Sequence, residues 1–218
     1  EDVRAVHFTY GQRHAIERVC ARHVAEQLNM PLVEFDLDII RQVGNSALVV
    51  GGADIAAQHG GAAHLPASFV PGRNILFLTA AAMLAFQCKA TELWTGVCQT
   101  DYSVYPDCRA DFLASMQTTL RHALDQANPD TALRLVAPLL NMSKAETFMI
   151  AAERGRLDML LEHTHTCYQG SRDRHAWGAG CAACPSCKLR IKGYEEFKAT
   201  TRQQSITGLM RRTYEAGF

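Results

Sequence analysis

Residues 95–109 read Thr95-Gly-Val-Cys-Gln-Thr-Asp-Tyr-Ser-Val-Tyr-Pro-Asp-Cys-Arg109, a stretch that combines two carboxylates, two tyrosines and an arginine. The apolar run from Leu93 to Val97 is typical of the end of a buried strand, and the pattern from Ala110 to Gln126 predicts a helix after it. In open α/β sheets, ligands bind in the crevice at the carboxyl ends of the strands. The stretch is therefore a candidate site of chemistry, and an ordinary polar surface turn is the alternative that the local sequence leaves open.

Length and composition set broad limits on the class of protein. The 218 residues suffice for one large domain or a domain with an appendage, and a hydrophobic share of 48% is ordinary for a globular protein. Because 22 Lys and Arg balance 22 Asp and Glu, no overall basic field favours a nucleic acid as partner. The longest apolar run, residues 75–86, is too short to span a bilayer, so we expect no membrane partner either.

Strand and helix patterns alternate over residues 1–155 and predict an α/β domain. A predicted helix from Ala15 to Asn29 connects the first two strands, and a β-α-β run of this length implies a parallel pair with a right-handed crossover. The loop between residues 44 and 68 is rich in Gly, Ala and His, and we expect it to be a mobile flap. The predicted strands are Val3–Phe8, Pro31–Leu37, Glu92–Val97 and Leu133–Ala137.

Two predicted helices begin with residues suited to anions. The helix from Ile75 to Lys89 is apolar on nearly every side and should be buried, which places Arg73 and Asn74 at its positive N-terminal end. A helix cap beside an ion-paired arginine is the alternative. Ser143 and Glu146 form a predicted capping box, which leaves Lys144 at a helix N-terminus where a cation is unfavourable unless an anion binds. Arg73, Asn74 and Lys144 are therefore candidate phosphate or carboxylate contacts.

Four cysteines predict a metal site in a helical region over residues 156–218. Cys181, Cys184 and Cys187 are separated by two-residue gaps, and thirteen residues separate Cys167 from Cys181. Four thiolates satisfy tetrahedral zinc in a closed, structural shell. An iron–sulfur cluster and free thiols are the alternatives that the spacing leaves open. The length and ordinary core of the chain argue against a secreted disulfide scaffold, so we expect a reducing, cytoplasmic compartment.

One of the nine histidines stands out as a site candidate. His14 follows the carboxyl end of the first predicted strand, where α/β proteins place ligands.

Five blocks spread over nearly the whole chain resemble the 7-cyano-7-deazaguanine synthases, which make a nitrile precursor of queuosine. Thr9, Gln99, Tyr102 and Val104 depart from the motifs of that family. The blocks are Phe8-Thr-Tyr-Gly-Gln-Arg-His14, Phe69-Val-Pro-Gly-Arg-Asn74, residues 95–109, Lys144-Ala-Glu-Thr147 and Thr166-Cys-Tyr-Gln-Gly170.

The resemblance implies a three-layer parallel sheet of the PP-loop (HUP, adenine nucleotide alpha hydrolase-like) type, with a C-terminal helical zinc-binding region. It implies an ATP-dependent ligase that converts 7-carboxy-7-deazaguanine and ammonia to 7-cyano-7-deazaguanine through adenylate and amide intermediates, with magnesium accompanying ATP. ATP is needed because a carboxylate is a poor electrophile and oxide a poor leaving group. The family also suggests a homodimer.

The resemblance further implies roles for residues in these blocks. Asp101 is the first candidate for magnesium or substrate, and Arg73 and Lys144 would hold phosphate or carboxylate during catalysis. Asp107 and Arg109 would contact the deazaguanine edge or its carboxylate, with an N-cap of the following helix as the alternative for Asp107. The remaining substrate- or nucleotide-binding candidates are Tyr10, Arg13, His14, Asn74, Gly96 and Tyr105.

The family also carries an SGGxDS phosphate loop that these residues do not contain. By its layout, a β-α unit should precede Glu1, with its strand between Val3–Phe8 and Glu92–Val97. Without such a strand, both neighbours would be left with unpaired backbone groups. Two alternatives therefore stay open: a zinc-stabilised binding or regulatory module, and a homologue that modifies a different acceptor.

Overall fold

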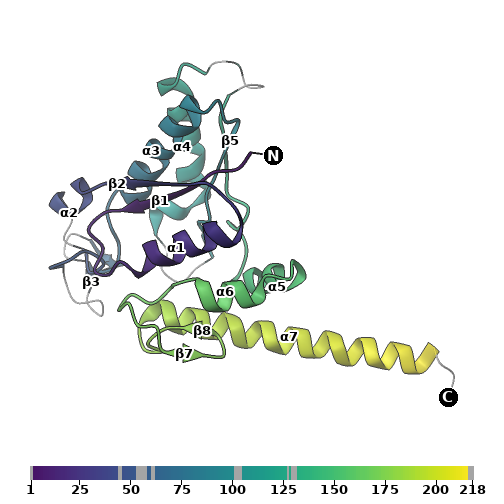
Figure 1. The fold of residues 1–218 in the computed structure, drawn as a ribbon. Helices are drawn as coiled ribbons and strands as arrows, with labels where there is room; N and C mark the ends of the chain where they lie inside the picture. Colours follow the sequence, from purple (N-terminus) through teal and green to yellow (C-terminus); the bar gives the residue numbers. More distant parts are fainter. Residues whose placement is uncertain are drawn as a thin grey trace.

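The computed structural model describes residues 2–43, 46–52, 58–59, 62–100, 105–126, 128 and 132–215. Asp101 and parts of the segment 44–68 lie outside these residues. Within them the chain is an α/β protein with a helical C-terminal region, as the sequence predicts (Figure 1).

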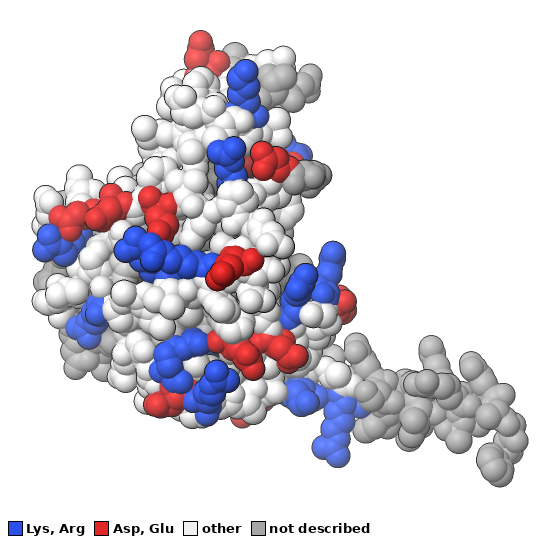
Figure 2. All heavy atoms as spheres, in the orientation of Figure 1, with Lys and Arg blue, Asp and Glu red and all other residues white. Residues whose placement is uncertain are grey.

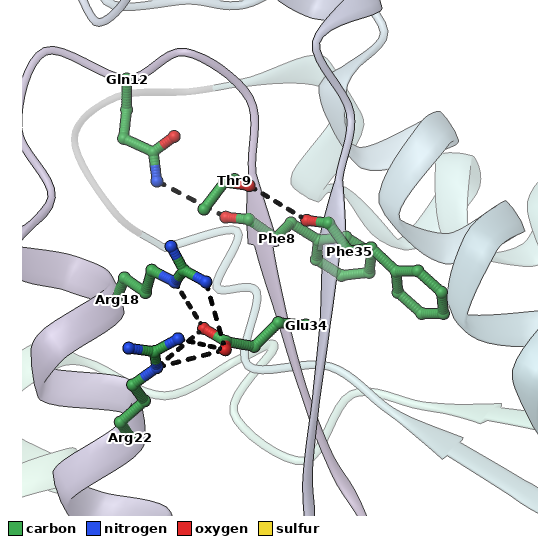
Figure 3. Close-up of polar contacts among 7 residues, drawn as sticks. All are labelled: Phe8, Thr9, Gln12, Arg18, Arg22, Glu34 and Phe35. Atoms are coloured by element: carbon green, nitrogen blue, oxygen red, sulfur yellow. Dashed lines mark hydrogen bonds and ion pairs between the residues drawn. The ribbon is translucent and has the colours of Figure 1, made fainter.

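The first structural unit is the predicted β-α-β run. Strand β1 (Ala5–Thr9) pairs in parallel with β2 (Leu32–Asp36), and Phe8 lies opposite Phe35 in the register. Helix α1 (Ile16–Gln27) connects the two strands and buries Cys20 and Ala25. Figure 3 shows Arg18 and Arg22 of α1 reaching Glu34 of β2, each with a nitrogen 2.7 Å from a carboxylate oxygen. Helix α1 therefore packs on the β1–β2 pair and also forms ion pairs with β2.

A second parallel pair follows later in the chain. Strand β5 (Glu92–Trp94) pairs with β6 (Arg134–Val136), and α4 (Ala110–Ala123) lies between them in sequence. Helix α3 (Arg73–Gln87) packs here as well. Their shared core consists of the buried residues Leu78, Ala82, Ala85, Leu113, Met116, Leu120 and Leu133.

The two parallel pairs form separate two-stranded sheets in the part of the chain that is described. Helix α3 spans both of them, because Phe77 stacks on Phe8 of β1 at 4.3 Å between ring centroids while Leu78 enters the core of the β5–β6 pair. The parallel α/β character is confirmed. The strand expected between β1 and β5 stays a prediction.

One expectation for α3 is wrong. The helix is apolar on nearly every side, yet Ile75, Met83 and Phe86 are 46%, 61% and 47% exposed. These residues share one face of the helix, which no described element covers. An apolar pattern on all sides of a helix therefore predicts burial only for the faces that other helices or strands cover.

The segment 44–68 is partly ordered into regular structure. Helix α2 (Ile39–Val43) precedes it, and strands β3 (Gln58–His59) and β4 (Ala62–Pro66) pair antiparallel within it. Ser46 is buried and its hydroxyl donates to the Ala67 carbonyl at 3.1 Å. This hydrogen bond joins the two ends of the segment. The mobility of the part between them stays a prediction.

Helices dominate the C-terminal region. Helix α5 (Lys144–Glu153) begins at the predicted capping box, in which the Glu146 amide donates to the Ser143 hydroxyl and the Ser143 amide to the Glu146 carboxylate. Helix α6 (Leu157–His163) and the hairpin β7 (Arg174–His175) and β8 (Gly178–Ala179) follow. The last helix, α7 (Pro185–Glu215), is one long helix that projects from the body in Figure 1.

Helix α7 packs closely against α5. Phe148 of α5 and Phe197 of α7 share one core, with ring centroids 5.9 Å apart. At Gly193 the helices approach so closely that a methyl group would lie 2.6 Å from Cβ of Lys144. The boundary predicted between residues 155 and 156 therefore passes beside a shared core.

Surface charges are mixed in sign. On the face shown in Figure 2, Lys and Arg alternate with Asp and Glu over the body of the molecule. Of the helices that the structure describes, none combines the length and the apolar character needed to cross a membrane.

The Glu34 ion pairs predict a specific acid sensitivity. Hydrogen bonds from Arg18 and Arg22 lower the pKa of Glu34 to about 2, against about 4.3 in an unfolded chain. The stabilisation is therefore complete above pH about 4.3 and is lost as the pH falls toward 2. We expect Glu34→Gln to lower the thermal midpoint at pH 7 and to match the wild type near pH 2. A difference of equal size at both pH values, or the same behaviour in the exposed-site control Glu26→Gln, would contradict this.

Candidate functional site

A cavity of about 400 Å³ lies beside the end of β1, the start of α1 and the start of α3. This volume is within the range of small-molecule sites. Its apolar walls come from Val6, Phe8, Leu48 and Phe77. The polar groups that face it are His7, Tyr10, Glu17, Arg73, Tyr105 and Tyr168.

Arg73 is the cation of the cavity. It is the first residue of α3, and its guanidinium carbon lies 6.0 Å from the ring centroid of Tyr10 and 5.9 Å from that of Phe77. Burial opposes its charge, but Tyr10 and Asp107 outweigh this effect and raise the pKa of Arg73. Its Nε is buried, and no described residue accepts a hydrogen bond from it. Arg73 is thus permanently charged, and its Nε–H is available to donate a hydrogen bond to a ligand.

Asp107 caps the same helix. It does not cap the helix that follows it: α4 begins after Arg109, and Asp107 lies in a 3-10 turn, Pro106–Cys108. The buried Asp107 carboxylate accepts from the Asn74 amide at 3.2 Å, and the Asn74 side chain donates to the Asp107 carbonyl at 3.0 Å. Asn74 and Asp107 are therefore joined by two hydrogen bonds. The carboxylate of Asp107 occupies the N-terminal end of α3, where the sequence predicts that an anion binds.

Two tyrosines from distant segments meet at the cavity wall. The Tyr105 hydroxyl lies 2.6 Å from the Ser68 hydroxyl and 3.4 Å from the Tyr168 hydroxyl. Burial, together with the neighbouring Tyr105, raises the pKa of Tyr168, so Tyr168 acts as a neutral hydrogen-bonding group. The sequence prediction includes Tyr105 but not Tyr168 or Ser68, although Tyr168 lies in the block Thr166–Gly170.

Glu17 is the carboxylate of the cavity, and the sequence prediction misses it. It is the second residue of α1, and it follows by three residues His14, which lies just before the helix. Burial raises the pKa of Glu17, while His14 and Arg73 lower it. Its place three residues after a predicted site residue is the signal that would have found it.

Arg13 and His14 lie beside the cavity rather than in its wall. Arg13 is exposed, and its guanidinium donates to the Gly52 carbonyl at 3.2 Å. The His14 ring meets His165 edge-on at 4.9 Å between centroids. Gly170 approaches so closely that a methyl group there would lie 2.9 Å from His14. His14 thus joins α1 to the segment that precedes the metal site.

The first half of the stretch 95–109 lies against the start of α5. The Cys98 thiol contacts the Met142 carbonyl at 2.8 Å, and the Gln99 side chain donates to Asn141 at 2.6 Å. Gly96 and Lys144 belong to these two adjoining segments, apart from the cavity wall, and Arg109 is exposed at the start of α4. The structure therefore divides the predicted site into a cavity around Arg73 and a second group near Lys144.

The four predicted metal ligands come together. The Sγ atoms of Cys167, Cys181, Cys184 and Cys187 lie within 4.8 Å of one another, and those of Cys181 and Cys187 are 4.0 Å apart. A tetrahedral zinc site with Zn–S bonds of about 2.3 Å requires sulfur separations of about 3.8 Å. The Cys184 amide points at the Cys181 sulfur at 3.3 Å. The arrangement fits one ion in a closed four-thiolate shell, with no position left for a substrate.

A buried cation accompanies this cluster. Arg190, one turn after Cys187 on α7, is 5% exposed. It donates to the carbonyls of Trp177 at 2.9 Å and Leu160 at 3.0 Å and to the hydroxyls of Thr164 and Thr166 at 2.9 Å each. With a divalent ion bound, four thiolates would carry a net charge of −2, and Arg190 would compensate part of it.

The metal site and the cavity share a short segment of chain. Tyr168, a wall of the cavity, directly follows the ligand Cys167, which is 1% exposed. The Ser186 hydroxyl, between two ligands, donates to the Thr166 carbonyl at 2.7 Å. The position of Tyr168 therefore depends on the order of the metal cluster.

Comparison with known proteins agrees with these features. A model of the family described as "Queuosine biosynthesis protein QueC" matches residues 1–198. A 7-cyano-7-deazaguanine synthase of Wolinella succinogenes is 42% identical over 202 residues, which cover 92% of this chain and 84% of the relative. A protein with the same name from Helicobacter pylori (strain J99) is 42% identical over 196 residues, which cover 89% of this chain and 85% of the relative. Another, from Lysinibacillus sphaericus, is 40% identical over 196 residues, which cover 90% of this chain and 84% of the relative. With the cavity and the four-cysteine cluster in place, the chain belongs to the QueC family of queuosine biosynthesis proteins.

Proposed function

We propose that the chain is an ATP-dependent ligase that converts 7-carboxy-7-deazaguanine and ammonia to 7-cyano-7-deazaguanine. The name shared by relatives that are 40–42% identical over about nine-tenths of the chain carries this proposal. The cavity supports it, because its volume of about 400 Å³ suits a purine-sized ligand and Arg73 offers a cation to a carboxylate.

The reaction follows from the chemistry of a carboxylate. Attack of the substrate carboxylate on the α-phosphate of ATP gives an acyl adenylate and releases pyrophosphate. Ammonia displaces AMP and leaves the amide. Activation of the amide oxygen by a second ATP then allows its loss, with two protons leaving the nitrogen, to give the nitrile. Each activation by ATP turns a poor leaving group, the oxygen of the carboxylate or of the amide, into a good one.

The proposed residue roles follow the two groups in the structure. Arg73 holds the substrate carboxylate in the cavity, where Tyr10 and Tyr105 pack against the ring. Lys144, at the positive end of α5 and beside the segment that contains Gly96, holds ATP phosphate. Asp101 serves magnesium or substrate, and Asp107 with Asn74 fixes the start of α3 and so the position of Arg73. Arg13, His14 and Arg109 border the site.

The same proposal includes the cofactor and the finer fold. Zinc is the ion of the cysteine cluster, magnesium accompanies ATP, and the two parallel pairs belong to a three-layer sheet of the PP-loop type. None of the eight cysteines, all of which lie in the described residues, forms a disulfide, which supports a reducing, cytoplasmic location. A homodimer is the proposed assembly, on the basis of the family.

A direct assay tests the function. Purified chain with bound zinc is incubated with 7-carboxy-7-deazaguanine, ATP, Mg²⁺ and ammonium, and the products are followed by mass spectrometry and AMP release. We expect ATP-dependent formation of the amide and then the nitrile, with no product when ammonium is omitted. Substrate binding without turnover would contradict the proposal and favour a binding module.

A further inference from the structure

We propose that Glu17 recognises the base of the substrate, by accepting hydrogen bonds from its N1–H and 2-amino groups. This inference rests on the proposed function, since it names the part of the same cavity that selects the ligand. It assigns a specificity-determining role to a residue outside every motif that carries the family resemblance.

The geometry of the cavity carries the argument. Glu17 faces the cavity together with Arg73 and three tyrosines, between apolar walls that include Phe8 and Phe77. No described residue donates a hydrogen bond to its carboxylate or forms an ion pair with it within 4.0 Å. The opposite charges of Glu17 and Arg73 therefore both remain available to a ligand in this cavity.

The electrostatics point the same way. Burial raises the pKa of Glu17, so the carboxylate, on a partly buried side chain, is partly desolvated. A partly desolvated acceptor gains stability when hydrogen-bond donors satisfy it. A ligand with two adjacent N–H donors would satisfy both carboxylate oxygens at once, as in the pairing of Asp and Glu with base edges.

A 7-deazaguanine ring offers such a pair of donors. Its N1–H and 2-amino group lie side by side on the six-membered ring, while the 7-carboxyl group is attached to the five-membered ring. The substrate therefore presents donors at one end, suited to Glu17, and a negative charge at the other, suited to Arg73. The polarity of the ligand matches the two charges of the cavity.

The same chemistry separates the two purine-like ligands of the reaction. Adenine carries a bare N1 acceptor and no 2-amino group, so its lone pair would face the Glu17 carboxylate and be repelled. Sites built around buried hydrogen-bonding groups reject analogues that cannot pair with them. Glu17 thus makes the cavity selective for the deazaguanine over the adenine of ATP.

The experiment compares the wild type and Glu17→Gln by calorimetric titration with two ligands. The first is 7-carboxy-7-deazaguanine, and the second is 7-carboxy-7-deazahypoxanthine, which lacks only the 2-amino group. Glutamine keeps the size of the side chain but offers one acceptor and one donor. We expect the Kd of the substrate to rise by about 10- to 100-fold in Glu17→Gln. In the wild type the analogue should bind correspondingly weakly, and in the variant the two ligands should bind nearly equally.

Controls separate recognition from stability. Glu26→Gln, an exposed change on the same helix, should leave both Kd values unchanged. The thermal midpoint of Glu17→Gln should not fall, because the change removes a desolvated charge. This inference would be overturned if the wild type binds the substrate but Glu17→Gln shows the same Kd for it, or the same preference for the substrate over the analogue. The proposed function would be unaffected by that result. Failure of the wild type to bind 7-carboxy-7-deazaguanine would overturn both.

Discussion

Cys187→Ser should yield protein that lacks zinc and shows no measurable nitrile synthesis. The Cys187 side chain is completely buried in the centre of the cysteine cluster. A serine hydroxyl does not ionise at neutral pH and is a poor zinc ligand, so three thiolates would remain around a shell that needs four. We expect the zinc content, measured by atomic emission, to fall from about one ion per chain to below about 0.1.

The loss should extend beyond the metal itself. Zinc binding and folding are coupled in small thiolate sites, so the segment around Tyr168 should become accessible to protease in the variant. Cys88→Ser is the matched control, because Cys88 is exposed and lies outside the cluster; it should keep zinc, protease resistance and activity. Full activity in Cys187→Ser protein without zinc would show that the cluster is dispensable for the site.

Arg73→Met should lower kcat/KM for 7-carboxy-7-deazaguanine by about 1,000-fold, equivalent to roughly 4 kcal/mol of lost stabilisation. Methionine fills much of the same space but removes the only cation among the residues that line the described cavity. The substrate carboxylate would then enter the cavity without a counter-charge, beside the like charge of Glu17. Steady-state kinetics at saturating ATP, with calorimetric titration of the substrate, measure the effect.

Two further variants locate the cause of that loss. Arg73→Lys keeps the charge but not the planar fork of donors, so we expect activity between that of the wild type and Arg73→Met. Arg154→Met changes an exposed arginine at the end of α5 and should behave as the wild type. An unchanged Kd for the substrate in Arg73→Met, with folding intact, would remove Arg73 from substrate binding.

Local patterns sufficed for much of the fold. The β-α-β run, the strands at Glu92–Trp94 and Arg134–Val136, and the Ser143 capping box were all predicted from residues that are neighbours in sequence. The pairing of those two strands was not predicted. The approach of Cys181, Cys184 and Cys187 was also predictable, because two-residue gaps place cysteine sulfurs close together in a short turn. The distant Cys167 joins them through the fold of the region.

The cavity depends on long-range packing, which no local pattern contains. Tyr105 and Tyr168 are 63 residues apart and meet only because the segment before the metal site folds back on α1. The following helix was the alternative partner for Asp107, but its carboxylate caps α3, which begins at Arg73, 34 residues earlier in the chain. The predicted role of Asp107 toward a ligand stays a prediction. Glu17 has no motif of its own. Such roles follow from which elements become neighbours, and the sequence alone does not show that.

The long sequence separation across the cavity has a consequence for how the protein is made. One wall comes from Val6 and Phe8 and another from Tyr168. Synthesis proceeds from the N-terminus, so the first wall leaves the ribosome roughly ten seconds or more before the last at common elongation rates. Until Cys187 has also emerged, the segment that carries Tyr168 lacks its full set of metal ligands. A nascent chain therefore has no complete binding cavity until the segment that carries Tyr168 and the four-cysteine cluster is in place.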